Sequence, residues 1–199
     1  MKPQSVSDKQ DQNQPDKSQA EQAVKTILSY LGEDPQRTEL LKTPARFIKA
    51  FEEHCSGYQK DPVSIFGSDF EPADNYNDFV CLTDIPIHSH CQHHIHPIIG
   101  KAHIAYWPGE KLAGLSKVAR ATHILSKRLV SQESLTTDIR ECLEEVLAPK
   151  GVAVLIAARH LCISTRGVNH PDMLTTTTAF SGIFDSDPEV RQRFLDKAY

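Results

Sequence analysis

The segment FVCLTDIPIHSHCQHHIHPIIGKAHIAYW, residues 79–107, determines the fold around which the rest of the chain is organised. It contains two runs rich in aliphatic, β-branched and aromatic residues, Phe79–His90 and Ile98–Trp107, each bounded by Pro, Gly or Asp. Such runs are typical of β-strands. Because the two runs follow one another along the chain, we expect them to pair as neighbours in an antiparallel sheet.

The sequence after this segment predicts helices first and strands again later. Ser116 is expected to cap a helix that continues to about Val130, and a second helix is expected at 135–147. Two further strands are expected at 152–164 and 174–184, and a short helix at 188–197. Two helices therefore separate two strand pairs, which predicts an α+β fold on an antiparallel sheet.

The amino-terminal part of the chain has a different composition. Residues 1–18 are polar and have almost nothing to bury, which predicts a disordered tail. Helices are expected at 19–32, from the spacing of apolar residues, and at 43–55, where Thr43-Pro44 is typical of a helix start. The expected organisation is a tail at 1–18, helices and a Pro- and Gly-rich linker at 19–77, and the main domain at 78–199.

Length, charge and composition restrict the class of protein. The chain has 199 residues, enough for one domain with appendages, and a formal net charge of -4 at pH 7 gives no reason to expect nucleic-acid binding. No apolar run approaches the roughly 20 residues that span a bilayer, and the amino terminus lacks the apolar centre of a signal peptide. We therefore expect a cytoplasmic protein that binds neither nucleic acid nor membrane.

Residues 88–96 read His-Ser-His-Cys-Gln-His-His-Ile-His, the densest cluster of potential metal ligands in the chain. Cys91 and His94 are three residues apart, close enough to bind one ion if the strand ends there in a turn. A thiolate and an imidazole suit zinc. A third ligand must come from elsewhere, and Cys162, within the strand expected at 152–164, is the natural candidate.

Two thiolates and one imidazole leave a fourth tetrahedral position open, as in catalytic zinc sites. His93 and His160 would then remain as nearby bases. Short histidine-rich tracts also bind metals adventitiously, so a site without function stays open as an alternative. The remaining histidines and cysteines are expected on the surface or in the core: His88, His90, His96 and His103, and Cys55, Cys81 and Cys142.

The cluster is part of a longer pattern. It continues through Gly100, His103–Tyr106, Gly114–Lys117, Gln132-Glu133, Gly151–Val154, His160–Cys162, Arg166–Val168 and Thr175–Thr178. With these motifs in this order, the chain resembles the GTP cyclohydrolase I family from about residue 20 to its end.

The resemblance implies a role for particular residues. It assigns zinc to Cys91, His94 and Cys162, and proton transfer to His93 and His160. Glu133 would accept the two hydrogen-bond donors of the guanine ring. The same pocket would be lined by Ser116 and Gln132, and the triphosphate would face Lys117, Arg120 and Arg166.

The resemblance also implies the tunnelling fold, in which strands and helices of each subunit join neighbouring subunits in a closed barrel. The element order predicted from the residues agrees with this fold, with 78–199 as the catalytic domain. The implied assembly is a homodecamer of two pentamers with sites between subunits, which would cover the exposed edges of the sheet.

The implied reaction converts GTP and water to 7,8-dihydroneopterin triphosphate and formate, the first step of folate or pterin synthesis. A zinc-bound water would attack C8 of guanine, assisted by the two histidines. Five positions depart from the family pattern: Gln92 replaces a glutamate, Ala157 an acidic residue and Ser134 an arginine, and Ile163 and Thr165 replace methionines. Two alternatives therefore stay open, a divergent enzyme of this fold with another substrate or a partial reaction, and a non-catalytic metal-binding or regulatory protein.

Overall fold

The computed structural model describes residues 14–68, 70–74 and 76–198. Of the expected tail, residues 1–13 lie outside this description. Helix α1 (Lys17–Tyr30) begins two residues earlier than expected, because Asp16 and Gln19 form a reciprocal cap. The Gln19 N–H donates to Asp16 Oδ1 at 2.8 Å, and the Asp16 N–H donates to Gln19 Oε1 at 2.9 Å.

A five-stranded sheet forms the centre of the described structure, in the order β5-β2-β3-β6-β7. The four long strands are β2 (Val80–Cys91), β3 (Pro97–Trp107), β6 (Gly151–His160) and β7 (Thr175–Phe180), and each pairs antiparallel with the next. The expected neighbour pairing is therefore confirmed. The short strand β5 (Leu129–Val130) was not expected, and it pairs parallel with the end of β2.

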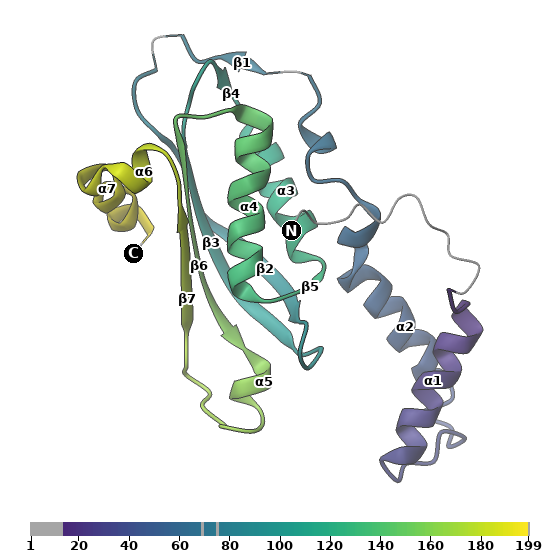
Figure 1. Cartoon of the computed structure of the whole chain (residues 1–199). Coiled ribbons are helices and arrows are strands. Elements are labelled where there is room, and N and C mark those ends of the chain that lie inside the picture. Colours follow the sequence, from purple (N-terminus) through teal and green to yellow (C-terminus); the bar gives the residue numbers. More distant parts are fainter. Residues whose placement is uncertain (1–13, 69, 75, 199) are drawn as a thin grey trace.

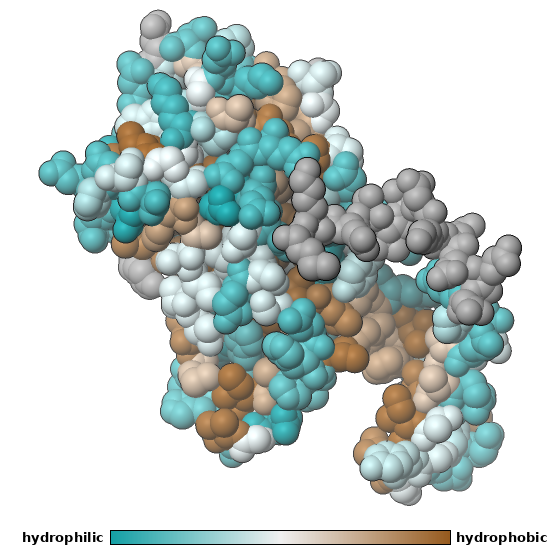
Figure 2. Space-filling view, viewed as in Figure 1, coloured by the Kyte–Doolittle hydropathy of each residue, from teal (hydrophilic) through white to brown (hydrophobic). Residues whose placement is uncertain are grey.

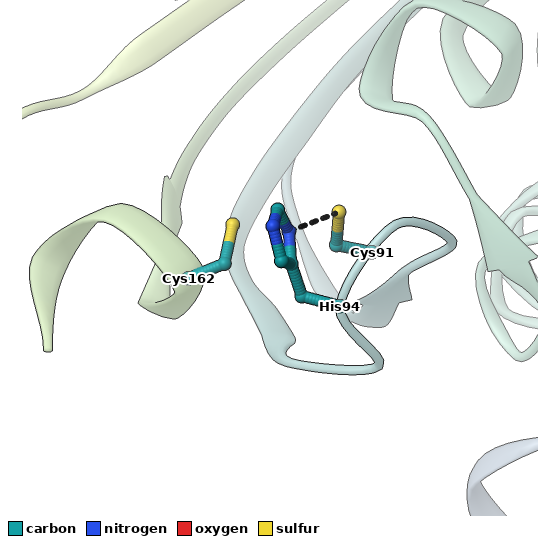
Figure 3. A group of neighbouring side chains, drawn as sticks. All are labelled: Cys91, His94 and Cys162. Carbon is teal, nitrogen blue, oxygen red and sulfur yellow. Dashed lines mark hydrogen bonds between the residues drawn. The ribbon is translucent and has the colours of Figure 1, made fainter. Parts of the chain in front are cut away.

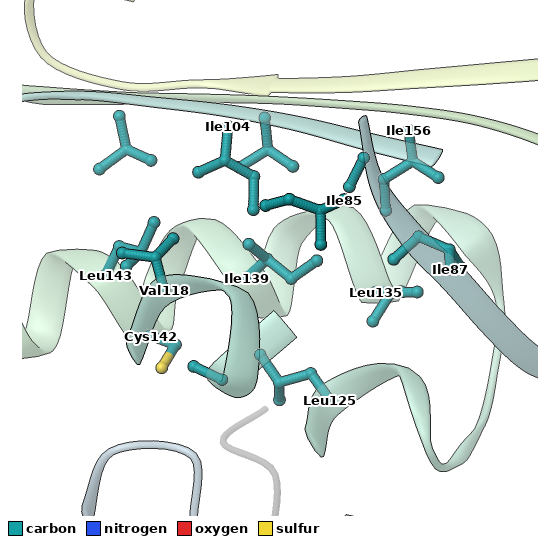
Figure 4. Close-up of a cluster of buried hydrophobic side chains, with 14 of the residues drawn as sticks. Ile85, Ile87, Ile104, Val118, Leu125, Leu135, Ile139, Cys142, Leu143 and Ile156 are labelled. Atoms are coloured by element: carbon teal, nitrogen blue, oxygen red, sulfur yellow. The ribbon is translucent and has the colours of Figure 1, made fainter. Parts of the chain in front are cut away.

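Helices α3 (Leu115–Ser126) and α4 (Gln132–Leu147) cover one face of the sheet (Figure 1). Alternate side chains of the strands point toward these helices and bury the main core (Figure 4). Its fully buried members include Ile87, Ile104, Leu135, Ile139, Leu143 and Ile156. The result is the α+β arrangement expected from the sequence.

The opposite face carries α6 (Ile183–Ser186) and α7 (Pro188–Ala198), beside the upper part of the sheet in Figure 1. Phe184 and Phe194 pack there against Phe79 and Leu155 in a second, smaller core. This helix pair leaves the other half of that face uncovered, which is the half nearer the end of β2 (Figure 1).

The amino-terminal helices α1 and α2 (Thr43–His54) pack against each other and project away from the sheet (Figure 1). The expected linker at 57–77 contains short elements, namely parts of η2 (Ser56–Gln59), η3 (Ser64–Phe66), and β1 (Glu71–Pro72), which pairs with β4 (Lys111–Leu112). Gly57 attaches this region to α3, since a Cβ there would lie 2.0 Å from the Ile124 carbonyl oxygen. Only glycine allows this close approach.

Three expected elements end four residues earlier than predicted. The helix expected to reach Val130 ends at Ser126, because Leu129 and Val130 pair with β2 instead. The strand expected to reach Ser164 ends at His160, opposite the first residues of its antiparallel partner β3, and the chain turns into the short helix α5 (Leu161–Ser164). The strand expected to reach Phe184 ends at Phe180, ahead of Gly182 with its positive φ of 51°.

In the described part of the chain, no helix combines the length and the apolar character needed to cross a lipid bilayer.

Candidate metal centre

A tight turn after β2 carries the first two candidate ligands. The Cys91 N–H donates to the His96 carbonyl at 2.8 Å, and the Ile95 N–H donates back to the Cys91 carbonyl at 2.8 Å. Ile95 has a φ of 54°, which a β-branched residue rarely adopts. This local strain lets the chain reverse within a few residues and brings the His94 side chain back beside Cys91.

Helix α5 supplies the third candidate ligand. Since β6 pairs with β3 up to His160 and Ile98, the residues that follow lie beside the turn after β2. The ligand atoms of Cys91, His94 and Cys162 all lie within 4.8 Å of one another (Figure 3). The expected gathering of these three residues is therefore present, although Cys162 lies in a short helix and not in the strand where it was expected.

The chemistry of these three donors fits a metal ion. Both thiols are buried, and the Cys91 Sγ lies 4.0 Å from His94 Nδ1. The pKa of the Cys162 thiol is raised, first by burial and then by the neighbouring Cys91. Two ionised thiolates this close would repel each other, and a divalent cation removes that repulsion. The group is thus compatible with a metal bound by two sulfurs and one nitrogen.

The two remaining histidines of the prediction lie at the same end of the sheet. His93 is exposed, and its Nδ1 lies 3.5 Å from the Cys91 Sγ. His160 ends β6 and is partly buried, with Nε2 at 2.7 Å from Gln132 Oε1. Burial lowers the pKa of His160, and the nearby Glu133 carboxylate opposes this shift. His160 is therefore a mainly neutral imidazole near pH 7, able to accept a proton.

The start of α4 also lies beside Cys91, His94 and Cys162, which we call the metal group. Ser131 caps this helix by accepting a hydrogen bond from the Ser134 N–H at 3.1 Å, and β5 just before it pairs with the end of β2. The two residues that follow Ser131 differ in the exposure of their side chains. The Gln132 side chain is buried at 1% exposure, whereas Glu133 is exposed.

Three of the expected phosphate and pocket residues lie elsewhere: Ser116, Lys117 and Arg120. They occupy the start of α3, which follows β4, whereas the end of α3 leads to β5 and the metal group. Lys117 is nine residues before Ser126, so it lies about 14 Å from that helix end along the axis. Its Nζ donates to the Phe66 carbonyl at 2.6 Å. Arg166, by contrast, is close enough to favour the Cys162 thiolate.

The other cysteines and histidines agree with the expected packing and surface roles. Cys142 is buried in the main core, and burial raises the pKa of its thiol to about 12, so it stays a thiol. Cys55 and Cys81 are partly buried. His90 and His103 are buried, and His90 packs against the rings of Phe51 and His54.

Two hydroxyl residues near this site were missed. Thr136 Oγ1 and Thr177 Oγ1 lie 2.7 Å apart, and Thr177 accepts from Gln132 Nε2 at 3.1 Å. The available signal was the four-residue spacing of Gln132 and Thr136 on one helix face, together with the alternation of Thr175–Thr178 across a strand. Neither pattern indicates the contact by itself, because it depends on how α4 packs on β7.

Comparison with known proteins identifies the family. The sequence model of a family described as GTP cyclohydrolase I matches residues 20–198. A GTP cyclohydrolase 1 of Maricaulis maris is 48% identical over 91% of this chain and 88% of the relative. The corresponding protein of Hyphomonas neptunium is 47% identical over 92% of this chain and 88% of its own length.

One solved structure, an archaeosine synthase QueF-Like in the apo form, aligns with 53% of this chain and 94% of its own. Its TM-score of 0.42 and 16% identity are too low to bear on the fold. The family match covers nearly the whole chain, and the relatives are nearly half identical. The chain therefore belongs to the GTP cyclohydrolase I family.

Proposed function

We propose that this chain is a GTP cyclohydrolase that converts GTP and water to 7,8-dihydroneopterin triphosphate and formate, at the start of folate or pterin synthesis. One observation carries the proposal: in a member of this family, Cys91, His94 and Cys162 place their ligand atoms within 4.8 Å, beside His160 and Glu133. The domain that performs the reaction is residues 78–199, and the proposed compartment is the cytoplasm, where thiols stay reduced.

Cys91, His94 and Cys162 would hold a zinc ion. Two thiolates and one imidazole match the ligands that zinc prefers, and three protein ligands leave a position for a small molecule. When bound, zinc supplies the Lewis acidity that makes a hydroxide nucleophile available near neutral pH. The turn that contains Ile95 holds Cys91 and His94 in place for this purpose.

His160 and His93 would move the protons of the reaction. His160 has a lowered pKa and is mainly neutral near pH 7, so it can take up a proton as C8 of the guanine ring is attacked. His93 is exposed next to the Cys91 thiol, where it can exchange protons with solvent. The partly buried His160 would keep a proton within the site, whereas the exposed His93 would release one to solvent.

The purine would be recognised by Glu133. Its carboxylate is exposed at the first turn of α4, and a carboxylate can accept from both the N1–H and the exocyclic amine of guanine. Ser116 and Gln132 would line the same pocket, Gln132 through its main chain, since its side chain is hydrogen-bonded inside the protein. The triphosphate would be bound by Lys117, Arg120 and Arg166.

A second copy of the chain would complete this site, within a decamer of two pentamers built on the tunnelling fold. Within one chain, Lys117 and Arg120 occupy the end of α3 that is farther from the metal group. The projecting helix α1 and its C-cap also expose Ile27, Tyr30 and Leu31 by 56%, 88% and 72%. Figure 2 shows apolar surface on the projecting arm. Apolar surface of this kind suits contact between subunits.

The direct test is incubation of metal-replete protein with GTP, followed by a formate assay and by fluorescence of the oxidised pterin. Formate and pterin in equal amounts are expected. Formate without pterin would support a second candidate, an enzyme that stops at a ring-opened product, which is favoured by Gln92 in place of the usual glutamate. Metal-loaded protein that releases neither product from GTP would refute the proposal.

A further inference from the structure

Gln132 makes more side-chain hydrogen bonds than a residue that only lines a pocket requires. Its Nε2 lies 3.0 Å from the Ile156 carbonyl oxygen, 3.0 Å from the Thr175 carbonyl oxygen and 3.1 Å from Thr177 Oγ1. Main-chain carbonyls can only accept hydrogen bonds. The amide nitrogen must therefore lie on this side, since the reversed amide would place Oε1 about 3 Å from two other oxygens that carry no hydrogen.

The hydroxyl groups around Gln132 fix the same orientation. Thr136 Oγ1 donates to the Gln132 carbonyl at 2.7 Å, which uses the only hydroxyl proton of Thr136. In the 2.7 Å contact between Thr136 and Thr177, the proton must then come from Thr177. Thr177 in turn accepts from Gln132 Nε2. The three residues thus form a closed ring of hydrogen bonds in which the two hydroxyl protons are assigned, while the two Nε2 hydrogens of Gln132 are shared among three acceptors.

This ring determines the protonation of His160. With Nε2 of Gln132 directed at the carbonyls, Oε1 faces His160 Nε2 at 2.7 Å. An amide oxygen only accepts, so His160 Nε2 must carry the hydrogen of that bond. In the neutral imidazole the lone pair is then on Nδ1. Among the described residues, no other hydrogen bond to the His160 ring is present.

We propose that Gln132 is a positioning residue that holds His160 in the tautomer with Nε2 protonated, so that Nδ1 is the nitrogen that accepts a proton during the reaction. The inference rests on the proposed function only for the role of His160 in proton transfer. The tautomer itself follows from the contacts within the chain. Gln132 therefore acts on the reaction through His160, without contributing its side chain to the binding of guanine.

The tautomer can be measured directly. Metal-replete protein labelled with 15N-histidine is examined by solid-state NMR at about pH 8.5, well above the ordinary histidine pKa of about 6.5. The His160 signals are identified by their absence from the His160→Asn variant. We expect a proton on Nε2 and none on Nδ1. A His160 ring with its proton on Nδ1, or on both nitrogens, overturns the inference.

Variants test whether this positioning matters to the reaction. Gln132→Met should lower kcat for GTP at least tenfold, while KM and metal content stay near the wild-type values. Unchanged kcat would overturn the positioning role. If this variant does not fold, the NMR measurement on the wild-type protein still decides the tautomer. The measurement also separates the two proposals, since a protein inert to GTP with His160 Nε2 protonated would refute the function alone.

A matched pair of valine variants isolates the hydroxyl ring. Thr177 faces Gln132, whereas Thr178 is the next residue of the same strand and is exposed on the other face of the sheet. Thr177→Val should lower kcat several-fold without raising KM, and Thr177→Ser, which keeps the hydroxyl, should restore it. Thr178→Val should leave kcat unchanged. Equal kcat in both valine variants and the wild type would contradict a contribution from the ring.

Discussion

At the end of the sheet where β2 and β6 finish, one chain brings Cys91, His94 and Cys162 within 4.8 Å and places the start of α4 beside them. At the other end, the first two turns of α3 carry Lys117 and Arg120, and no comparable cluster of metal ligands is present there in the described residues. Both sets of residues belong to the family pattern. The difference is that one set already forms a group in one chain, whereas the other would join that group only through a neighbouring subunit of the proposed assembly.

Backbone geometry explains this difference. Because β3 pairs with both β2 and β6, the turn between β2 and β3 lies beside the end of β6 without any contribution from another subunit. The start and the end of α3, in contrast, are separated by the length of a rigid helix of 12 residues, about 18 Å. Metal loading should therefore be a property of the single chain, whereas GTP turnover should depend on assembly.

The largest expected effect comes from removing a metal ligand. Cys162→Ala should reduce metal content from about one ion per chain to nearly none and lower GTP turnover by roughly a thousandfold or more, because three protein ligands leave little redundancy. Elemental analysis and a formate assay measure both quantities. Cys81→Ala is the control and should retain its metal, since Cys81 is partly buried away from the group. A Cys162→Ala protein that still binds one ion per chain would rule out this ligand set.

The sequence was sufficient to predict that Cys91, His94 and Cys162 come together, but not the local structure that holds them. Cys91 and His94 are close in the chain, so their spacing alone indicates a shared site. Cys162 lies in the short helix α5, although the aliphatic residues before it continue without a break and resemble a longer strand. Strand propensity does not show at which residue the pairing of β6 with β3 stops. The early end of the helix after Ser116 has the same cause, since β5 forms only through contact with β2.

The sequence did not indicate which residues form hydrogen bonds with one another at the site. The family pattern indicated Gln132 as a pocket residue, yet its side chain bonds to Ile156, Thr175 and Thr177, which come from two different strands. Such contacts depend on the packing of α4 against β6 and β7. Contacts between a helix and two strands far apart in the chain leave no regular spacing in the sequence from which they could be predicted.

The second prediction concerns Glu133, at the metal end of the sheet. Glu133→Gln should lower kcat/KM for GTP by about a hundredfold or more, because an amide would direct a donor at a donor of guanine. Metal content should not change. Glu145→Gln makes the same substitution on an exposed position of the same helix and should have no effect. If native protein hydrolysed ATP as fast as GTP, Glu133 would not be the purine-recognising residue.

The third prediction tests the division between the two ends directly. Cys162→Ala and Arg120→Ala subunits are each expected to be poorly active at low GTP concentration. Co-expressed in equal amounts, they should form mixed oligomers in which about a quarter of the sites combine an intact metal group with an intact Arg120 from a neighbour.

The control for this experiment pairs Cys162→Ala with Glu133→Gln. Both residues belong to the metal end of one chain, so mixing these subunits should restore much less activity. Recovery to the same level in both mixtures, or in neither, would show that the two ends do not meet across subunits in the way proposed.

The smallest expected effect lies between the two ends, at His103 in the middle of β3. This histidine is buried at 7% exposure, and its Nδ1 accepts from the Asp84 N–H at 3.5 Å. Burial lowers its pKa, an effect that Asp84 opposes and Lys101 reinforces. The unfolded chain therefore binds a proton at this residue more readily than the folded one. As the pH falls below about 6.5 toward the folded pKa, the free energy of unfolding decreases.

His103→Gln should remove this contribution, since glutamine keeps an acceptor for Asp84 but does not titrate. Urea midpoints measured at fixed protein concentration at pH 8 and pH 5.5 should therefore decrease less in the variant than in the wild type. The other histidines are present in both proteins and cancel in this difference. Metal content should be unchanged, because His103 is not part of the metal group. Identical midpoint shifts in the two proteins would mean that His103 takes up its proton equally well in the folded and unfolded chain, and that burial in the middle of the sheet does not disfavour its charge.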